Sequence, residues 1–180
     1  MKKTLFIISL LLALAFSSNA QSITGKTWYC YLGSSEGLKS SLAAEFKTDG
    51  TCQFMLIMTM PFGKEIVPEF KNLNVDISLS VQMIAKATYS MKSKDVIAYR
   101  YSKDDIIPLL NVEVNGLSGD AKKQAEDTVK KALYSMHDTF IDTFDEVVPE
   151  KGEFKINSLY EDAMELENEI DSYSFETIDG

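Results

Sequence analysis

The sequence has little of the side-chain chemistry on which most enzymes depend. It contains one histidine, His137, and two cysteines, Cys30 and Cys52, among 180 residues. A catalytic triad needs a base beside its nucleophile, and a zinc site usually draws on several histidine or cysteine ligands. The nine glycines are scattered rather than gathered in a phosphate-binding loop. These absences predict a protein that is not an enzyme and that holds no metal or cofactor.

Positive charge is also scarce. The chain carries 18 lysines and arginines against 27 aspartates and glutamates, a formal net charge of -9. An acidic surface of this kind repels the phosphate backbone of a nucleic acid. We therefore expect no nucleic-acid partner.

The first 20 residues have the three parts of a signal peptide. Lys2 and Lys3 form a positive start, residues 5–16 are apolar, and Ser18-Asn19-Ala20 offers small residues at a cleavage site. The apolar run is too short for a transmembrane helix, which needs roughly 20 residues. The sequence thus predicts cleavage after residue 20 and export to the periplasm or the extracellular medium. Residues 21–180 then form a single domain with no transmembrane anchor.

Most of this domain alternates between apolar and polar residues, which is typical of β-strands. The pattern begins with residues 26–60, where Asp49-Gly50 favours a tight hairpin turn. Its longest stretch, residues 77–91, is apolar on one side and predicts a strongly bent or bulged strand. Further segments are expected at residues 96–101 and 106–114 and around Phe154, Met164 and Tyr173, which gives eight or nine strands.

One strand, residues 52–60, is apolar on both faces. Phe54, Leu56 and Met58 alternate with Met55 and Ile57. Something is therefore expected to cover its outer face.

Residues 118–148 change to the helical period and predict one amphipathic helix of about 30 residues, or about 45 Å. Eight or nine strands with one inserted helix fit either a closed up-and-down barrel or a sandwich with the helix on one face. The sequential hairpins favour the barrel. The helix packs either outside the sheet, over Met55 and Ile57, or within the barrel, and its pattern fits both placements.

The two cysteines fall on the first and third expected strands. If the second strand lies between them, their separation is about 9 to 10 Å, beyond the Cα limit of about 7 Å for a disulfide. Export permits a disulfide, but this geometry favours buried free thiols.

Short motifs at both ends of the domain resemble the small exported lipocalin-like domains of Bacteroidetes, within the calycin group. They are Gly25-Lys26-Thr27-Trp28, the hairpin from Phe46 to Thr51, the segment from Phe154 to Leu159, and Ala163-Met164-Glu165-Leu166. The resemblance implies an antiparallel up-and-down barrel that holds a small apolar molecule. The long helix, and middle strands without a clear Gly-x-Tyr, depart from the family pattern.

The residues expected to face the barrel interior are candidates for ligand binding, although side chains of the same kind also fill small barrels. Two of them, Tyr101 and Tyr173, offer hydroxyl groups, and Arg100 or Lys86 at the mouth would suit an anionic ligand. The expected lining is Trp28, Phe46, Phe54, Leu56, Met58, Val81, Met83, Tyr89, Tyr101 and Tyr173.

The sequence therefore predicts a non-enzymatic binder of a small hydrophobic molecule. The alternative is an interaction module with a filled core, which meets a protein or a cell-surface polymer. Exposed tyrosines are favoured in such recognition surfaces, and Tyr29, Tyr31, Tyr99 and Tyr101 are the candidates.

Overall fold

The computed structural model describes residues 22–35, 37–62, 70–72 and 74–177. The expected signal peptide, residues 1–20, and residues 63–69 and 73 of the expected loop lie outside the described residues. The strands are β1 (Thr27–Ser35), β2 (Leu38–Phe46), β3 (Thr51–Phe62), β4 (Asp76–Ser93), β5 (Val96–Arg100), β6 (Ile107–Asn115), β7 (Lys151–Leu159), β8 (Ala163–Glu167) and β9 (Ser172–Thr177). The helices are α2 (Gly119–Tyr134), α3 (His137–Val147) and a short 3₁₀ turn (Lys103–Asp105).

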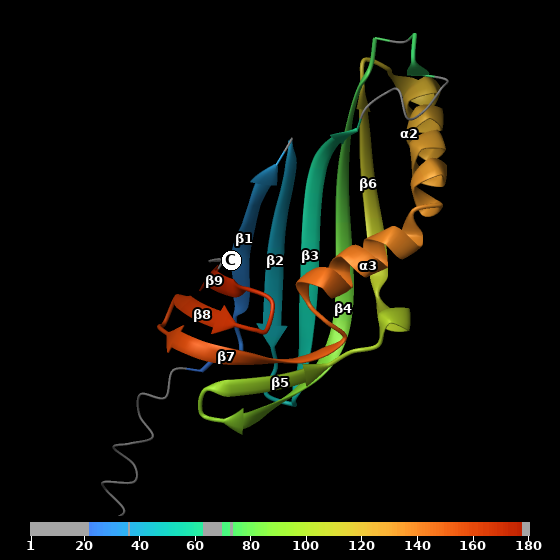
Figure 1. Cartoon of the computed structure of the whole chain (residues 1–180). Helices are drawn as coiled ribbons and strands as arrows, with labels where there is room; N and C mark the ends of the chain where they lie inside the picture. Colours follow the sequence, from blue (N-terminus) through green and yellow to red (C-terminus); the bar gives the residue numbers. More distant parts are fainter. Residues whose placement is uncertain (1–21, 36, 63–69, 73, 178–180) are drawn as a thin grey trace, which may run out of the picture.

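Eight strands close into an antiparallel barrel (Figure 1). Their order around the barrel is β1, β2, β3, β4, β5, β7, β8 and β9, and β9 pairs again with β1. The closing pairs of β1 and β9 are Trp28 with Thr177 and Tyr29 with Glu176. The pairing confirms the predicted antiparallel up-and-down barrel, and it rules out the sandwich.

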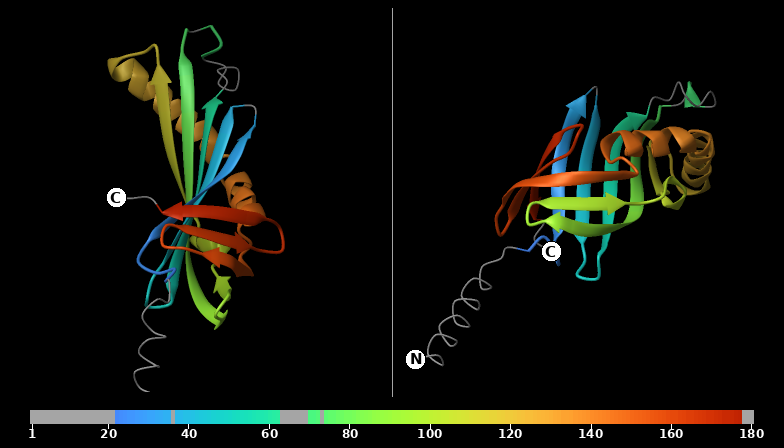
Figure 2. Two further views of the ribbon diagram at one scale, coloured as in Figure 1. Left: turned by 90° about the vertical axis from the view of Figure 1, so that its left-hand side faces the viewer. Right: turned by 60° about the horizontal axis from the view of Figure 1, so that its bottom comes forward.

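The ninth strand, β6, extends the sheet beyond the barrel. β4 pairs with β6 along Asp76–Ile84 and with β5 along Thr88–Ser93, while β3 pairs with it on the other side. The molecule is therefore a barrel at one end and an open sheet of β1, β2, β3, β4 and β6 at the other (Figure 2). Among the described strands β6 pairs with β4 alone and forms an edge of the sheet, a position that tolerates Pro108.

One continuous core fills the barrel and covers the inner face of the open sheet. Its members alternate along each strand, as in β4, where Val81 and Met83 are fully buried and Gln82 between them is partly exposed. Trp28 is completely buried, and its indole N–H donates a hydrogen bond to the carbonyl of Ile23 at 2.8 Å. This bond ties the segment before β1 to the start of that strand.

The helical region lies where the sequence predicts it, but the prediction of one helix over 118–148 is wrong. α2 ends at Tyr134, because the N–H groups of Ser135 and Met136 bind the carbonyls three residues back, at 3.3 and 2.9 Å. The Ser135 hydroxyl binds the Ala132 carbonyl as well, at 2.6 Å. Bonds of this tighter type end an α-helix. The chain then turns, so that α2 runs beside β6 while α3 crosses in front of β3 and β4 (Figure 1).

Both helices pack on the inner face of the sheet. Val129 of α2 and Phe144 of α3 are completely buried in the same core as Val114 of β6. On the opposite face of β6, Ile107 and Leu109 are each 48% exposed. The helices therefore close the inner side of the molecule, and no helix among the described residues covers the outer face of β3.

Neither described helix is long and apolar enough to cross a membrane.

The cysteines are free buried thiols, as the strand order predicts. β2 lies between β1 and β3, so that Cys30 pairs with Leu42 while Cys52 pairs with Phe46. Burial raises the pKa of the Cys52 thiol to about 12. This thiol therefore stays protonated and unreactive at neutral pH.

Candidate functional site

The residues expected to line a ligand cavity lie in the one continuous core that fills the barrel and covers the inner face of the open sheet. Phe46 and Phe54 contact each other edge to face with ring centroids 6.1 Å apart, and Phe54 lies 6.0 Å from Phe154. The aromatic rings thus fill much of the closed part of the barrel, and a ligand-binding role for these residues stays a prediction. Nine of the ten are buried, namely Trp28, Phe46, Phe54, Leu56, Met58, Val81, Met83, Tyr101 and Tyr173, and Tyr89 is partly buried.

Two of these residues use their hydroxyl groups to hold the end of α3. The Tyr101 hydroxyl donates to the Val148 carbonyl at 2.7 Å, and the Tyr173 hydroxyl donates to the Val147 carbonyl at 2.9 Å. The last carbonyls of a helix have no partner within the helix, so these two bonds satisfy them. Tyr101 and Tyr173 therefore fix the point at which the chain leaves α3 and enters β7.

An ion pair reinforces the same junction. Asp145 lies 2.8 Å from the Lys103 ammonium group and accepts the Glu150 backbone N–H at 2.8 Å. Burial favours the protonated form of Asp145, but these hydrogen bonds and the charge of Lys103 outweigh it and lower its pKa. The linker between α3 and β7 is thus held by the two tyrosine hydroxyls and by Asp145.

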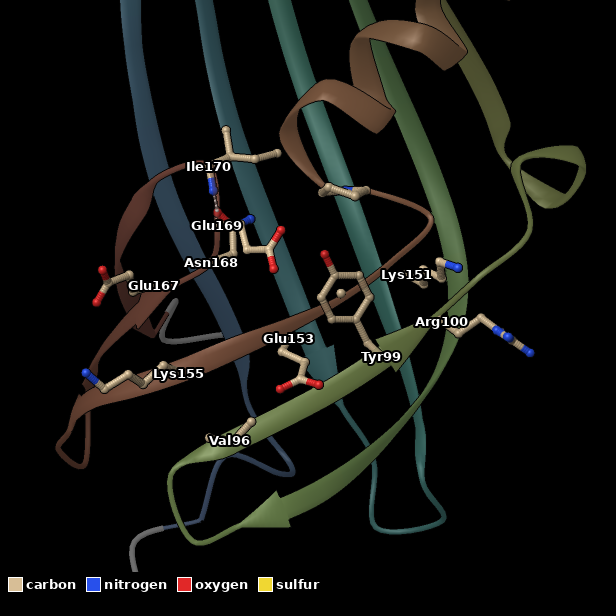
Figure 3. Close-up of a pocket in the computed structure, with 12 residues that line it drawn as sticks. Val96, Tyr99, Arg100, Lys151, Glu153, Lys155, Glu167, Asn168, Glu169 and Ile170 are labelled. Carbon is tan, nitrogen blue, oxygen red and sulfur yellow. Dashed lines mark hydrogen bonds between the residues drawn. The ribbon is translucent and has the colours of Figure 1, made fainter.

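Beside this junction the barrel wall has an opening. The first residues of β7, Lys151–Phe154, pair with β5 on one side, whereas pairing with β8 begins only at Lys155, opposite Glu167. A pocket of about 920 Å³ lies here, between β7, the β8–β9 hairpin and the linker after α3 (Figure 3). Its lining residues are Val96, Tyr99, Arg100, Pro149, Lys151, Gly152, Glu153, Lys155, Glu167, Asn168, Glu169 and Ile170.

The charges around the pocket are balanced, in contrast to the acidic chain as a whole. The basic groups are Arg100, Lys151 and Lys155. Three glutamates, at positions 153, 167 and 169, match them in number. Arg100, which the sequence singled out as a possible cation at the mouth, does line this pocket. The side chains that line the pocket therefore carry no net charge.

Tyr99 is the residue that gives the pocket a specific chemistry. It points inward from β5, is 4% exposed, and stacks on Phe154 with ring centroids 4.8 Å apart. Figure 3 shows its ring extending from β5 across β7, with the hydroxyl directed away from β5. This hydroxyl is buried and has no hydrogen-bond partner among the described residues. Burial raises the pKa of Tyr99 far above its ordinary value, so the hydroxyl keeps its proton.

The prediction that Tyr99 and Tyr101 are exposed recognition residues is wrong, because both occupy inward positions and are buried. Tyr31, in contrast, is 56% exposed. The sequence did contain a signal for Tyr99, since Gly152 interrupts the strand directly opposite it. A glycine within a strand often marks close approach by another group.

His137 lies at the start of α3, with its Nδ1 atom 3.2 Å from an Asp138 carboxylate oxygen. Within the part of the chain that the structure describes, no three His, Cys, Asp or Glu side chains are grouped so as to hold a metal ion.

No protein-family model matches the sequence, and no curated protein matches it. Among solved structures, the chain is similar to a lipocalin-like protein from Bacteroides uniformis ATCC 8492. The two are 16% identical with a TM-score of 0.42, and the match covers 87% of this chain and 98% of the other.

Proposed function

We propose that the protein is an exported, non-enzymatic binding protein that takes a small, partly apolar molecule into the pocket beside Tyr99. The observation that carries the proposal is the buried Tyr99 hydroxyl, which finds no partner among the described residues. A buried donor left without a bond costs about 1–3 kcal/mol. A ligand that accepts a hydrogen bond from this hydroxyl would offset that cost.

The size and lining of the pocket define the class of ligand. Small-molecule sites commonly enclose about 300–1,000 Å³ and combine apolar walls with a few polar groups. Here Tyr99 supplies a neutral donor, while Ile170 and Pro149 add apolar surface. The ligand is expected to pair one accepting group, such as a carbonyl or carboxylate oxygen, with an apolar body.

Export is part of the proposal and is supported by the sequence of the first 20 residues. Positive charge at Lys2 and Lys3, the apolar run and the small residues before Gln21 are arranged as in a signal peptide. Either the periplasm or the extracellular medium fits this pattern.

Native mass spectrometry of residues 21–180, purified from the exporting cell, tests the proposal. We expect an added mass of a few hundred daltons that is lost on denaturation and recovered in an organic extract. The Tyr99→Phe variant should carry less of it, whereas Tyr160→Phe, at a side chain 60% exposed in the turn before β8, should carry the wild-type amount. A bare mass in the wild type, together with no binding of molecules extracted from the same compartment, would overturn the proposal.

A further inference from the structure

Two adjacent rows of side chains cross the outer face of the open sheet, and they are mostly apolar. The strand register places their members directly opposite one another, so that each row runs from β1 to β6. The first row is Tyr29, Ala43, Met55, Ile84 and Ile107, and the second is Tyr31, Ser41, Ile57, Gln82 and Leu109. We call these ten residues the outer rows.

Most of the outer rows are accessible within the described part of the chain, whereas Ser41 and Ala43 on β2 are buried. Tyr31, Ile107 and Leu109 are exposed, and Met55 and Ile57 are partly exposed. The helices cannot cover them, since both lie on the opposite face of the sheet. Contiguous apolar surface of this kind marks an interaction site.

The charged residues that border the outer rows alternate in sign. On β2, Glu45 lies on one side of the rows and Lys39 on the other. On β4 and β6, Lys86 lies on the Glu45 side and Glu113 on the Lys39 side. Glu176 adds one acidic group at the β9 end of the first row. The border is thus nearly balanced, although the whole chain has a net charge of -9.

We propose that the occupant of this face is a second copy of the same chain, packed sheet to sheet about a two-fold axis that runs across the strands. An axis between the outer rows places the first row of one copy over the second row of the other. The same axis places Glu45 of each copy against Lys39 of the other copy. Lys86 of each copy then lies on the same side of the interface as Glu113 of the other copy. The alternating border is therefore self-complementary, as an isologous interface requires.

The size of the face also suits a dimer. The face spans five strands about 4.8 Å apart. Along the strands it spans four rows about 6.7 Å apart, namely the two outer rows and one border row on each side, so its footprint is roughly 24 by 27 Å. That is about 650 Å², close to the roughly 800 Å² per partner of a standard stable interface. Two sheets packed in this way normally keep their strand directions within about 30°.

The oligomeric state of residues 21–180, measured by sedimentation equilibrium over a range of concentrations, tests this proposal. We expect a dimer that dissociates in the Leu109→Glu variant, because a carboxylate would then be buried in the second row. Tyr160→Asp, a charge added at an exposed site away from the sheet face, should leave the dimer intact. Retained circular dichroism in each variant shows that the fold has not been lost.

A charge exchange tests the arrangement of the two copies. Lys39→Glu and Glu45→Lys should each weaken the dimer at least tenfold, because each creates two pairs of like charges across the axis. The double variant Lys39→Glu/Glu45→Lys should recover most of the lost affinity. A monomer at every concentration would overturn the proposal, and so would a dimer unaffected by Leu109→Glu. Neither result bears on the pocket beside Tyr99, which lies at the barrel end.

Discussion

The hydroxyl of Tyr99 lies over Gly152, where a Cβ atom would come within 2.8 Å of it. Tyr99 and Gly152 are direct partners across β5 and β7, so the missing side chain leaves the space that the tyrosine ring occupies. One glycine thus leaves room for the buried ring of Tyr99, a residue that lines the pocket in the barrel wall.

The Gly152→Ala variant should displace the Tyr99 ring. We expect a loss of about 1–3 kcal/mol in the free energy of unfolding, the usual cost of overpacking, and weaker ligand binding. Urea denaturation measures the first effect. Because the clash is with Tyr99, the cost should fall when Gly152→Ala is combined with Tyr99→Phe, as a double-mutant cycle would show. Costs that simply add would contradict this account.

The Tyr99→Phe variant should be as stable as the wild type without ligand, or more stable by up to about 1 kcal/mol, because it removes a buried donor that has no protein partner. Denaturant unfolding of protein stripped of ligand gives the comparison. A clear loss of stability would mean that the hydroxyl already has a partner within the protein.

Tyr101→Phe and Tyr173→Phe, in contrast to Tyr99→Phe, should each lower the stability of the protein. Each leaves a carbonyl at the end of α3 without its hydrogen bond, which should cost about 1–3 kcal/mol of the free energy of unfolding. Tyr134→Phe, at an exposed tyrosine at the end of α2, serves as the matched control. Equal stabilities in all three variants would show that these hydroxyls do not anchor the helix.

The protein should lose stability in alkali. The unfolded Cys52 thiol ionises near its ordinary pKa of 9.0, whereas the folded thiol holds its proton until about pH 12. Between these values the unfolded chain binds fewer protons, so the free energy of unfolding falls as the pH rises above about 9. Buried Tyr99 and Tyr101, with raised pKa values, add to the same trend. Denaturation at pH 8, 9 and 10 measures it.

The buried thiols also permit a direct chemical check. A thiol reagent at pH 8 should leave Cys30 and Cys52 unmodified in the folded protein and should label both in urea. Rapid labelling of the folded chain would contradict their burial in the core.

Local patterns predict the barrel well, because alternation and turn residues act over a few positions. Asp49-Gly50 forms the expected turn, and the antiparallel strands on either side of it pair with Phe46 opposite Cys52. The break in the helix depends on hydrogen bonds of Ser135, a residue that an uninterrupted helix also tolerates.

The pocket is harder to predict from the sequence. It exists because β8 ends opposite Lys155, so that Lys151–Phe154 have no partner strand on that side among the strands described. The length of β8 is set by tertiary pairing, so no local pattern in the sequence indicates it. Inward-facing residues such as Phe54 pack against one another in the core, and the ligand contacts that the sequence predicts for them stay a prediction.

The central claim is that the Tyr99 hydroxyl binds a ligand, and calorimetric titration tests it most directly. Ligand-free wild type, Tyr99→Phe and Tyr160→Phe would each be titrated with the molecule recovered from the native protein. We predict that Tyr99→Phe binds at least tenfold more weakly, which corresponds to the loss of about 1.4 kcal/mol expected for one buried hydrogen bond. Equal affinities in all three proteins would contradict the account and place the ligand elsewhere on the molecule.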